Sequence, residues 1–284
     1  MLTTVVAIAG GILIGLCLGV LGGGGSILTV PVLVSMLHVG PQSATSASLI
    51  IVGITSVLAA VAHARGGHVR WKAAAVFGVI GSVTAFGGSI LNGAVDPQVL
   101  LIAFSALMVV AATAMLRRTG KPADSEDGAD RDPDAGPEPV EGGGDSSVAV
   151  ATAKKSRVTT AQAGKLVAAA LIVGFLTGFL GVGGGFLIVP ALVLALGYSM
   201  PVAVGTSLVI IAITSAGAFV ERLGSASIPW QIVVPFTIAA IVGSFAGTAI
   251  SDRISGNALT RSFAVLLVVV AVYVATTAGL SLAR

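Results

Sequence analysis

Charged side chains are scarce in this sequence of 284 residues. Only 10% of its residues are Asp, Glu, Lys or Arg, whereas a soluble domain carries about a quarter. The acids are also confined, because nine of the twelve lie between Asp124 and Asp145 and the others are Asp96, Glu221 and Asp252. This composition excludes a soluble globular protein. The formal charge of +3 gives no reason to expect a nucleic-acid partner.

Cysteine is also nearly absent. The single cysteine, Cys17, lies inside an apolar run, so no internal disulfide can form. The first residues, Met1 to Thr4, include no basic side chain, which argues against a cleaved signal peptide. We therefore expect the first helix to be retained.

The apolar segments lack ionisable groups. No Asp, Glu, Lys or Arg lies well inside any of them, which disfavours a carboxylate-based proton or sodium antiporter. No metal-ligand cluster, nucleophile–base pair or carboxylate pair is apparent, so we expect no metal, no cofactor and no enzyme activity. His38 and His63 lie near segment ends, where a loop or interfacial position is expected.

Apolar residues dominate what remains. They make up 55% of the chain, and a helix needs about 20 of them to cross a bilayer. The sequence thus predicts an all-α integral membrane protein. The expected segments are 2–20, 26–38, 43–63, 70–92, 97–116, 165–180, 186–197, 201–221, 229–250 and 258–281.

The two halves of the chain are repeats of four to five helical segments each. At a constant offset of 159 residues, Gly15, Gly19, Leu21, Gly22, Gly24, Gly25, Leu28, Val30 and Pro31 match Gly174, Gly178, Leu180, Gly181, Gly183, Gly184, Leu187, Val189 and Pro190. Ser48, Thr55 and Trp71 match Ser207, Thr214 and Trp230 in the same register. We expect a first repeat over 1–118, a disordered acidic cytoplasmic linker over 119–162, and a second repeat over 163–284.

Basic residues favour opposite orientations for the two repeats. They cluster at 65–72, at 117–121 and at 154–165, which indicates cytoplasmic positions. The second-half loop equivalent to 65–72 is neutral, whereas the following loop carries Arg253 and Arg261. That exchange favours an inverted repeat, with a parallel repeat left open.

Glycine runs interrupt a long apolar stretch in each half. As one helix, Leu2 to Val39 would measure about 57 Å at 1.5 Å per residue, nearly twice a hydrocarbon core of about 30 Å. The stretch must therefore break, and unwound backbone with a helix start behind it suits an anion. The candidate substrate-binding residues here are Gly22, Gly23, Gly24, Gly25 and Ser26, with Gly181, Gly183, Gly184 and Gly185 in the second half. The alternative is that these glycines serve only helix packing, as the pairs Gly15-x-x-x-Gly19 and Gly174-x-x-x-Gly178 are expected to do.

Serine and threonine residues lie near the start of the third segment of each half. Hydroxyls can donate to an oxyanion or bond to their own helix. Because they recur near both breaks, Thr45, Ser46 and Ser48 are candidates in the first half, and Gly205, Thr206 and Ser207 in the second.

These motifs resemble the TauE/SafE family of sulfite and organosulfonate exporters. The resemblance is carried by the two glycine-rich segments, by Ala-Thr-Ser-Ala-Ser-Leu at 44–49 and by Val-Gly-Thr-Ser-Leu at 204–208. It implies transport of small sulfur-containing anions, such as sulfite or sulfoacetate, across the inner (cytoplasmic) membrane of a bacterium. The first half lacks the Gly-Thr-Ser core of the second, so the two half-sites need not be equivalent.

The leading hypothesis is a multi-pass exporter that works by alternating access around a midplane anion site. An anion channel, or a membrane scaffold or partner subunit, is the alternative, and a cation carrier that uses backbone carbonyls stays open. The expected partners are a small-molecule anion and the lipid bilayer, with a homo-oligomer allowed.

Overall fold

The computed structural model describes residues 2–92, 95–119, 160–180, 185–222, 228–251 and 253–282. These residues form ten α-helices and no strand, one helix for each predicted segment. The helices are α1 (Leu2–Leu21), α2 (Gly24–Ser35), α3 (Pro41–Arg65), α4 (Trp71–Asn92), α5 (Pro97–Thr119), α6 (Thr160–Leu180), α7 (Gly185–Leu196), α8 (Met200–Arg222), α9 (Trp230–Ser251) and α10 (Gly256–Leu282).

Helix length and composition confirm an all-helical membrane protein. In the described part of the chain, seven helices are long and apolar enough to cross a bilayer, and the shorter apolar helices are α1, α2 and α7. Most of the expected linker, residues 120–159, lies outside the described residues.

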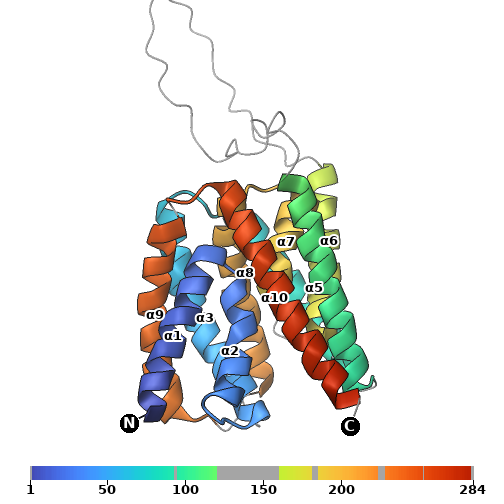
Figure 1. Cartoon of the computed structure of the whole chain (residues 1–284). Helices are drawn as coiled ribbons and strands as arrows, with labels where there is room; N and C mark the ends of the chain where they lie inside the picture. The colour runs from blue at the N-terminus through green and yellow to red at the C-terminus, as the bar shows by residue number, and fades with distance from the viewer. Residues whose placement is uncertain are drawn as a thin grey trace, which may run out of the picture.

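Helices α1 and α2 form a hairpin that enters the bundle and returns. Figure 1 shows α1 rising from the end that carries the N-terminus and α2 descending beside it. Helix α1 ends because Gly22 has a φ of +70°, a backbone conformation that side chains other than glycine rarely adopt. The Gly23 N–H then bonds to the Leu21 carbonyl over 2.9 Å, which closes a tight turn. The break predicted from the glycine run is thus present.

The main helix contacts join the two halves of the chain. Helix α1 packs on α9, and its repeat equivalent α6 packs on α4; the equivalent helices α3 and α8 pack on each other, as do α5 and α10. Exchanging the halves maps this set of contacts onto itself. In Figure 1 both termini lie at one end of the bundle, α1 and α5 run away from that end, and α6 and α10 run towards it. The equivalent helices α1 and α6, and likewise α5 and α10, therefore run in opposite directions in this view.

Small residues make the contacts between α1 and α9 and between α4 and α6 very close. A Cβ placed on Gly15 would lie 2.0 Å from the Ala240 carbonyl oxygen, and one on Gly178 would lie 1.8 Å from that of Ala85. The expectation that the Gly-x-x-x-Gly pairs serve helix packing is confirmed at both places, where only glycine allows the backbones to approach.

Two neighbouring glycines of α4 provide a test of this packing. A Cβ on Gly88 would lie 2.3 Å from the Phe175 carbonyl oxygen, whereas one on Gly87 would meet no atom within 4 Å. We expect Gly88→Ala to lower the free energy of unfolding by about 2 kcal/mol, because backbone cannot give way like a side chain. Gly87→Ala should instead stabilise the helix by up to about 1 kcal/mol. Thermal unfolding of both variants in one detergent measures the difference, and equal melting temperatures would contradict the α4–α6 contact.

Basic side chains gather at the end of the bundle opposite the termini. The α3–α4 connection, the end of α5, the start of α6 and the α9–α10 connection lie there. They carry Arg65, Arg70, Lys72, Arg117, Arg118, Lys165, Arg253 and Arg261. Among the described lysines and arginines, Arg222 alone ends a helix on the other side. The repeat-matched residues Trp71 and Trp230 begin α4 and α9 at opposite ends, and both are more than half exposed, as aromatic residues at two membrane interfaces would be.

Candidate functional site

The first turns of α2 and α7 meet inside the bundle. A Cβ on Gly23 would lie 2.0 Å from the Gly185 carbonyl oxygen, and one on Gly185 would lie 2.4 Å from the Ser26 hydroxyl oxygen. The two helix starts that the repeat predicted are therefore in contact. Gly181, Gly183 and Gly184, the remaining predicted residues of the second break, lie outside the described residues.

The glycines of the first break face protein at close range. A Cβ on Gly22 would lie 2.6 Å from the Ser207 hydroxyl, one on Gly24 2.6 Å from Leu266, and one on Gly25 2.7 Å from the Ile14 carbonyl oxygen. The break of one half thus packs against the hydroxyl motif of the other half. Tight packing is one role of these glycines.

Most of the predicted serine hydroxyls bond to carbonyls of their own chain segment. Ser26 donates to the Gly23 carbonyl over 2.7 Å, and Ser46 donates to that of Gln42 over 3.2 Å. The repeat-matched residues Ser48 and Ser207 donate to carbonyls three residues earlier, Thr45 over 2.7 Å and Val204 over 2.8 Å. Each hydroxyl has only one proton, so these serines must rotate before they can donate to an anion.

The second-half motif contacts the α3–α4 connection. A Cβ on Gly205 would lie 2.4 Å from the His68 carbonyl oxygen, and the fully buried Thr206 hydroxyl accepts the Arg70 N–H over 3.1 Å. His63 lies beside this contact and is itself buried, with Nε2 3.1 Å from the Gly19 carbonyl oxygen. The expectation of a loop or interfacial position for His63 is wrong, because the end of α1 covers this last turn of α3.

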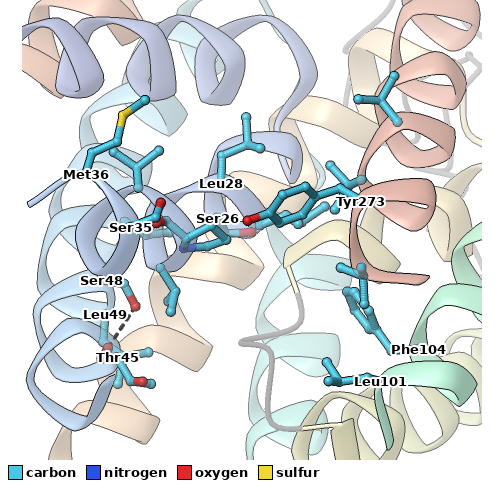
Figure 2. A pocket seen from close by; sticks show the side chains of 18 of the residues that line it. Ser26, Leu28, Ser35, Met36, Thr45, Ser48, Leu49, Leu101, Phe104 and Tyr273 are labelled. Carbon is cyan, nitrogen blue, oxygen red and sulfur yellow. Dashed lines mark hydrogen bonds between the residues drawn. The ribbon is translucent and has the colours of Figure 1, made fainter. Parts of the chain in front are cut away.

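A cavity of about 480 Å³ opens beside the start of α2. It lies between α2, α3, α5, α8 and α10, and Figure 2 shows Tyr273 reaching from α10 towards Ser26. The predicted residues that line it are Ser26, Thr45 and Ser48. Most other lining residues are apolar: Ile27, Leu28, Val30, Pro31, Val32, Met36, Leu49, Val52, Leu101, Phe104, Val269, Val270 and Val274. Gly205, Thr206, Ser207 and Ser46 are not in the lining.

The sequence model described as "Sulfite exporter TauE/SafE" matches residues 7–274. The chain belongs to this family. A "Probable membrane transporter protein" of Xylella fastidiosa (strain Temecula1) is 33% identical over 277 residues, covering 95% of this chain and 94% of that protein. One of Methanocaldococcus jannaschii is 26% identical and covers 86% of both chains. YunE of Bacillus subtilis, also a "Probable membrane transporter protein", is 25% identical and covers 94% of this chain and 95% of its own. No solved structure matches.

Several residues that line the cavity of this TauE/SafE protein are not among the predicted site residues. Phe104, Ser215 and Tyr273 lie in α5, α8 and α10, far in sequence from either break. Ser215 belongs to the Thr-Ser pair that follows the second hydroxyl motif, which is the one signal that could have suggested it. The other two lie in uniformly apolar helices, where sequence does not tell an inward from a lipid-facing side.

The described residues offer no metal site, since no three His, Cys, Asp or Glu side chains gather anywhere among them. The cavity lining contains hydroxyls and apolar groups but no Lys, Arg, Asp or Glu. Any recognition of charge there must use hydroxyls and backbone dipoles. The sequence predicted these same groups, helix-start backbone and hydroxyls, for anion binding.

Proposed function

We propose that this TauE/SafE family transporter exports a small sulfur-containing anion, such as sulfite, sulfoacetate or a related organosulfonate, by alternating access around the cavity. Family membership supports transport, and the family description supports sulfur oxyanions. The main support for the proposal is the cavity itself. It is lined by hydroxyls of α3 and by Ser26 at the start of α2, and it lies between helices of both repeats.

Anion binding without a cation is physically reasonable at this place. The first amides of a helix have no acceptor within that helix, and the helix dipole makes the same end positive. No side chain of a described residue caps the start of α2, and Ser26 lies in its first turn and lines the cavity. Rotation of Ser26 and Ser48 would add hydroxyl donors to an anion that lies in the cavity beside this positive helix end.

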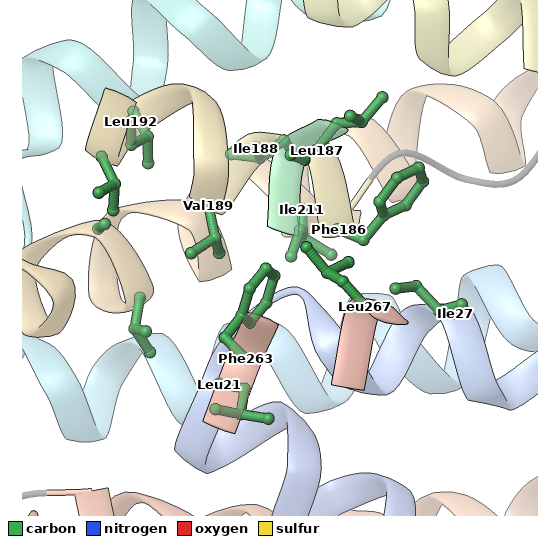
Figure 3. Packing of buried hydrophobic residues seen from close by; sticks show 14 of the residues in the cluster. Leu21, Ile27, Phe186, Leu187, Ile188, Val189, Leu192, Ile211, Phe263 and Leu267 are labelled. Carbon is green, nitrogen blue, oxygen red and sulfur yellow. The ribbon is translucent and has the colours of Figure 1, made fainter. Parts of the chain in front are cut away.

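Unequal packing of the two half-sites supports alternating access. The cavity residues Leu49, Ser48 and Phe104 are 9%, 7% and 2% exposed, whereas their repeat equivalents Leu208, Ser207 and Phe263 are 0% exposed and do not line the cavity. In Figure 3 Phe263 lies near Leu21, Val189 and Ile211 in the hydrophobic core. This difference in exposure supports one open and one closed half-site, as expected if inverted repeats exchange conformations.

The basic end of the bundle sets the proposed orientation. An excess of Lys and Arg marks the cytoplasmic side, so the end that carries the termini would face outward. Met36, at the rim of the cavity, follows α2 at that outward end. We place the chain in the inner (cytoplasmic) membrane, open to the outside, with the acidic segment 119–162 in the cytoplasm.

The alternatives predict different measurements. An anion channel needs a continuous path, whereas the packing around Phe263 fills the inward half-site; single-channel currents far above transporter turnover would favour a channel. A scaffold or partner subunit would produce no solute flux in proteoliposomes.

Transport of sulfoacetate by the purified chain in proteoliposomes tests the proposal. We expect Ser48→Ala to lower binding about tenfold or more, because a hydrogen bond to a charged group contributes roughly 1.5–3 kcal/mol. Ser89→Ala is the matched control: it also donates to a carbonyl three residues earlier, over 2.8 Å, but it is exposed on α4. Flux that is absent in the unmodified chain, or equal losses in the two variants, would contradict the proposed site.

A further inference from the structure

The cavity is much larger than the simplest substrate of the proposed function. Sulfite has four non-hydrogen atoms and a bulk on the order of two or three water molecules, each about 30 Å³. The cavity holds about 480 Å³, within the range of sites for ligands with an organic body. A lone sulfur oxyanion would therefore leave most of it unfilled.

The cavity lining combines a few hydroxyls with a larger apolar surface. Three of its serines, Ser26, Ser48 and Ser215, are buried, each less than 9% exposed. The more exposed lining residues include the apolar Met36 and Val269, at 61% and 59%, together with the hydroxyl-bearing Ser35 and Tyr273. An occupant that satisfied this lining would place a polar group against the buried serines and an apolar body along the remaining surface.

The side chain of Ser215 independently points to a ligand beside the buried serines. Its side chain is 6% exposed and lines the cavity, and it makes no hydrogen bond with the described residues. This sets it apart from Ser26 and Ser48, which donate to carbonyls. Because this hydroxyl lines the cavity and donates to no carbonyl of a described residue, an oxyanion in the cavity can accept a hydrogen bond from it.

We propose that the substrate is an amphipathic organic anion, with its oxyanion at Ser26, Ser48 and Ser215 and its apolar body along Pro31, Met36 and Val269. This inference rests on the proposed function, which it narrows from sulfur anions in general to those with an extended apolar part. Such a ligand would have on the order of ten non-hydrogen atoms.

Binding of an alkanesulfonate series to the purified full-length chain tests the inference. The probes are sulfite, sulfoacetate, and methane-, butane- and hexanesulfonate, with uncharged hexyl methyl sulfone as the control, titrated calorimetrically in lipid nanodiscs. We expect the Kd to fall about fourfold for each added methylene up to the hexyl compound. Ser215→Ala should weaken all the sulfonates by a similar factor, because it acts on the charged end.

Two valines of α10 give a matched pair of variants. Val269 lines the cavity, whereas Val265, one turn earlier and 58% exposed, does not. We expect Val269→Trp to abolish the gain with chain length, and Val265→Trp to retain that gain.

The outcomes separate the two proposals. If the sulfonates bind with a Kd independent of chain length, the amphipathic substrate is wrong and the proposed function survives. If the sulfone binds as tightly as hexanesulfonate, the cavity takes apolar or lipid chains without recognising charge, and the inference is wrong. If no anion binds, the proposed function itself fails.

Discussion

Replacing Gly23 with alanine is expected to destabilise the protein strongly and to abolish transport. The new Cβ would lie 2.0 Å from the Gly185 carbonyl oxygen and 2.6 Å from its carbon, so α2 and α7 would have to separate. We expect a loss of about 3 kcal/mol in the free energy of unfolding, the upper end of ordinary overpacking. Thermal unfolding in detergent and sulfoacetate flux in proteoliposomes measure the two effects.

Gly24→Ala is the control for this prediction. Its Cβ would meet Cδ2 of Leu266 at 2.6 Å, and the end of a flexible side chain can move aside. We expect a loss below about 1 kcal/mol for this variant. If Gly23→Ala were as stable and active as Gly24→Ala, the contact between the two helix starts would be wrong.

Cysteines placed at Ser48 and Ser207 are expected to react at very different rates. The two serines are repeat equivalents with similar hydrogen bonds, but Ser48 lines the cavity and Ser207 is fully buried. Cys17 is the only native cysteine, so Cys17→Ala gives a background without thiols. If the second open state has a population of 0.1–10%, Ser48→Cys should react about ten to a thousand times faster with a small membrane-impermeant thiol reagent added outside.

Labelling from the cytoplasmic side completes the test. In inside-out vesicles under transport conditions, Ser207→Cys should become reactive and Ser48→Cys should be protected. Equal rates from both sides for both variants would contradict alternating access. Reaction at both positions from one side alone would instead favour a channel.

The sequence was sufficient to predict all ten helices. Apolar runs bounded by proline, glycine or charge left little choice, and the predicted segments differ from the described helices by a few residues at their ends. The repeat also predicted a glycine break with a helix start behind it in each half, and the starts of α2 and α7 are in contact. The helices follow from local composition, and the pairing of the two breaks follows from the internal sequence match.

The lining of the candidate site could not be predicted to the same degree. Gly22 to Gly25 and Ser207 lie close to one another in the folded chain, yet they contact protein and not the cavity. Phe104 and Tyr273 line it, although nothing distinguishes them from lipid-facing aromatic residues. A membrane helix is apolar on every side, so its inward face is decided by its neighbours, and here those neighbours come from the other half of the chain.

Helix α1 packs on α9 and helix α4 packs on α6, so each of these contacts joins the two halves of the chain. This arrangement affects how the protein is made. When the first half leaves the ribosome, the glycine faces of α1 and α4 have no partner until α6 and α9 are inserted. Separately expressed halves should therefore be degraded singly and accumulate only together. Gene fusion of a five-segment ancestor that formed a dimer of two oppositely inserted copies would produce the same contacts between the halves.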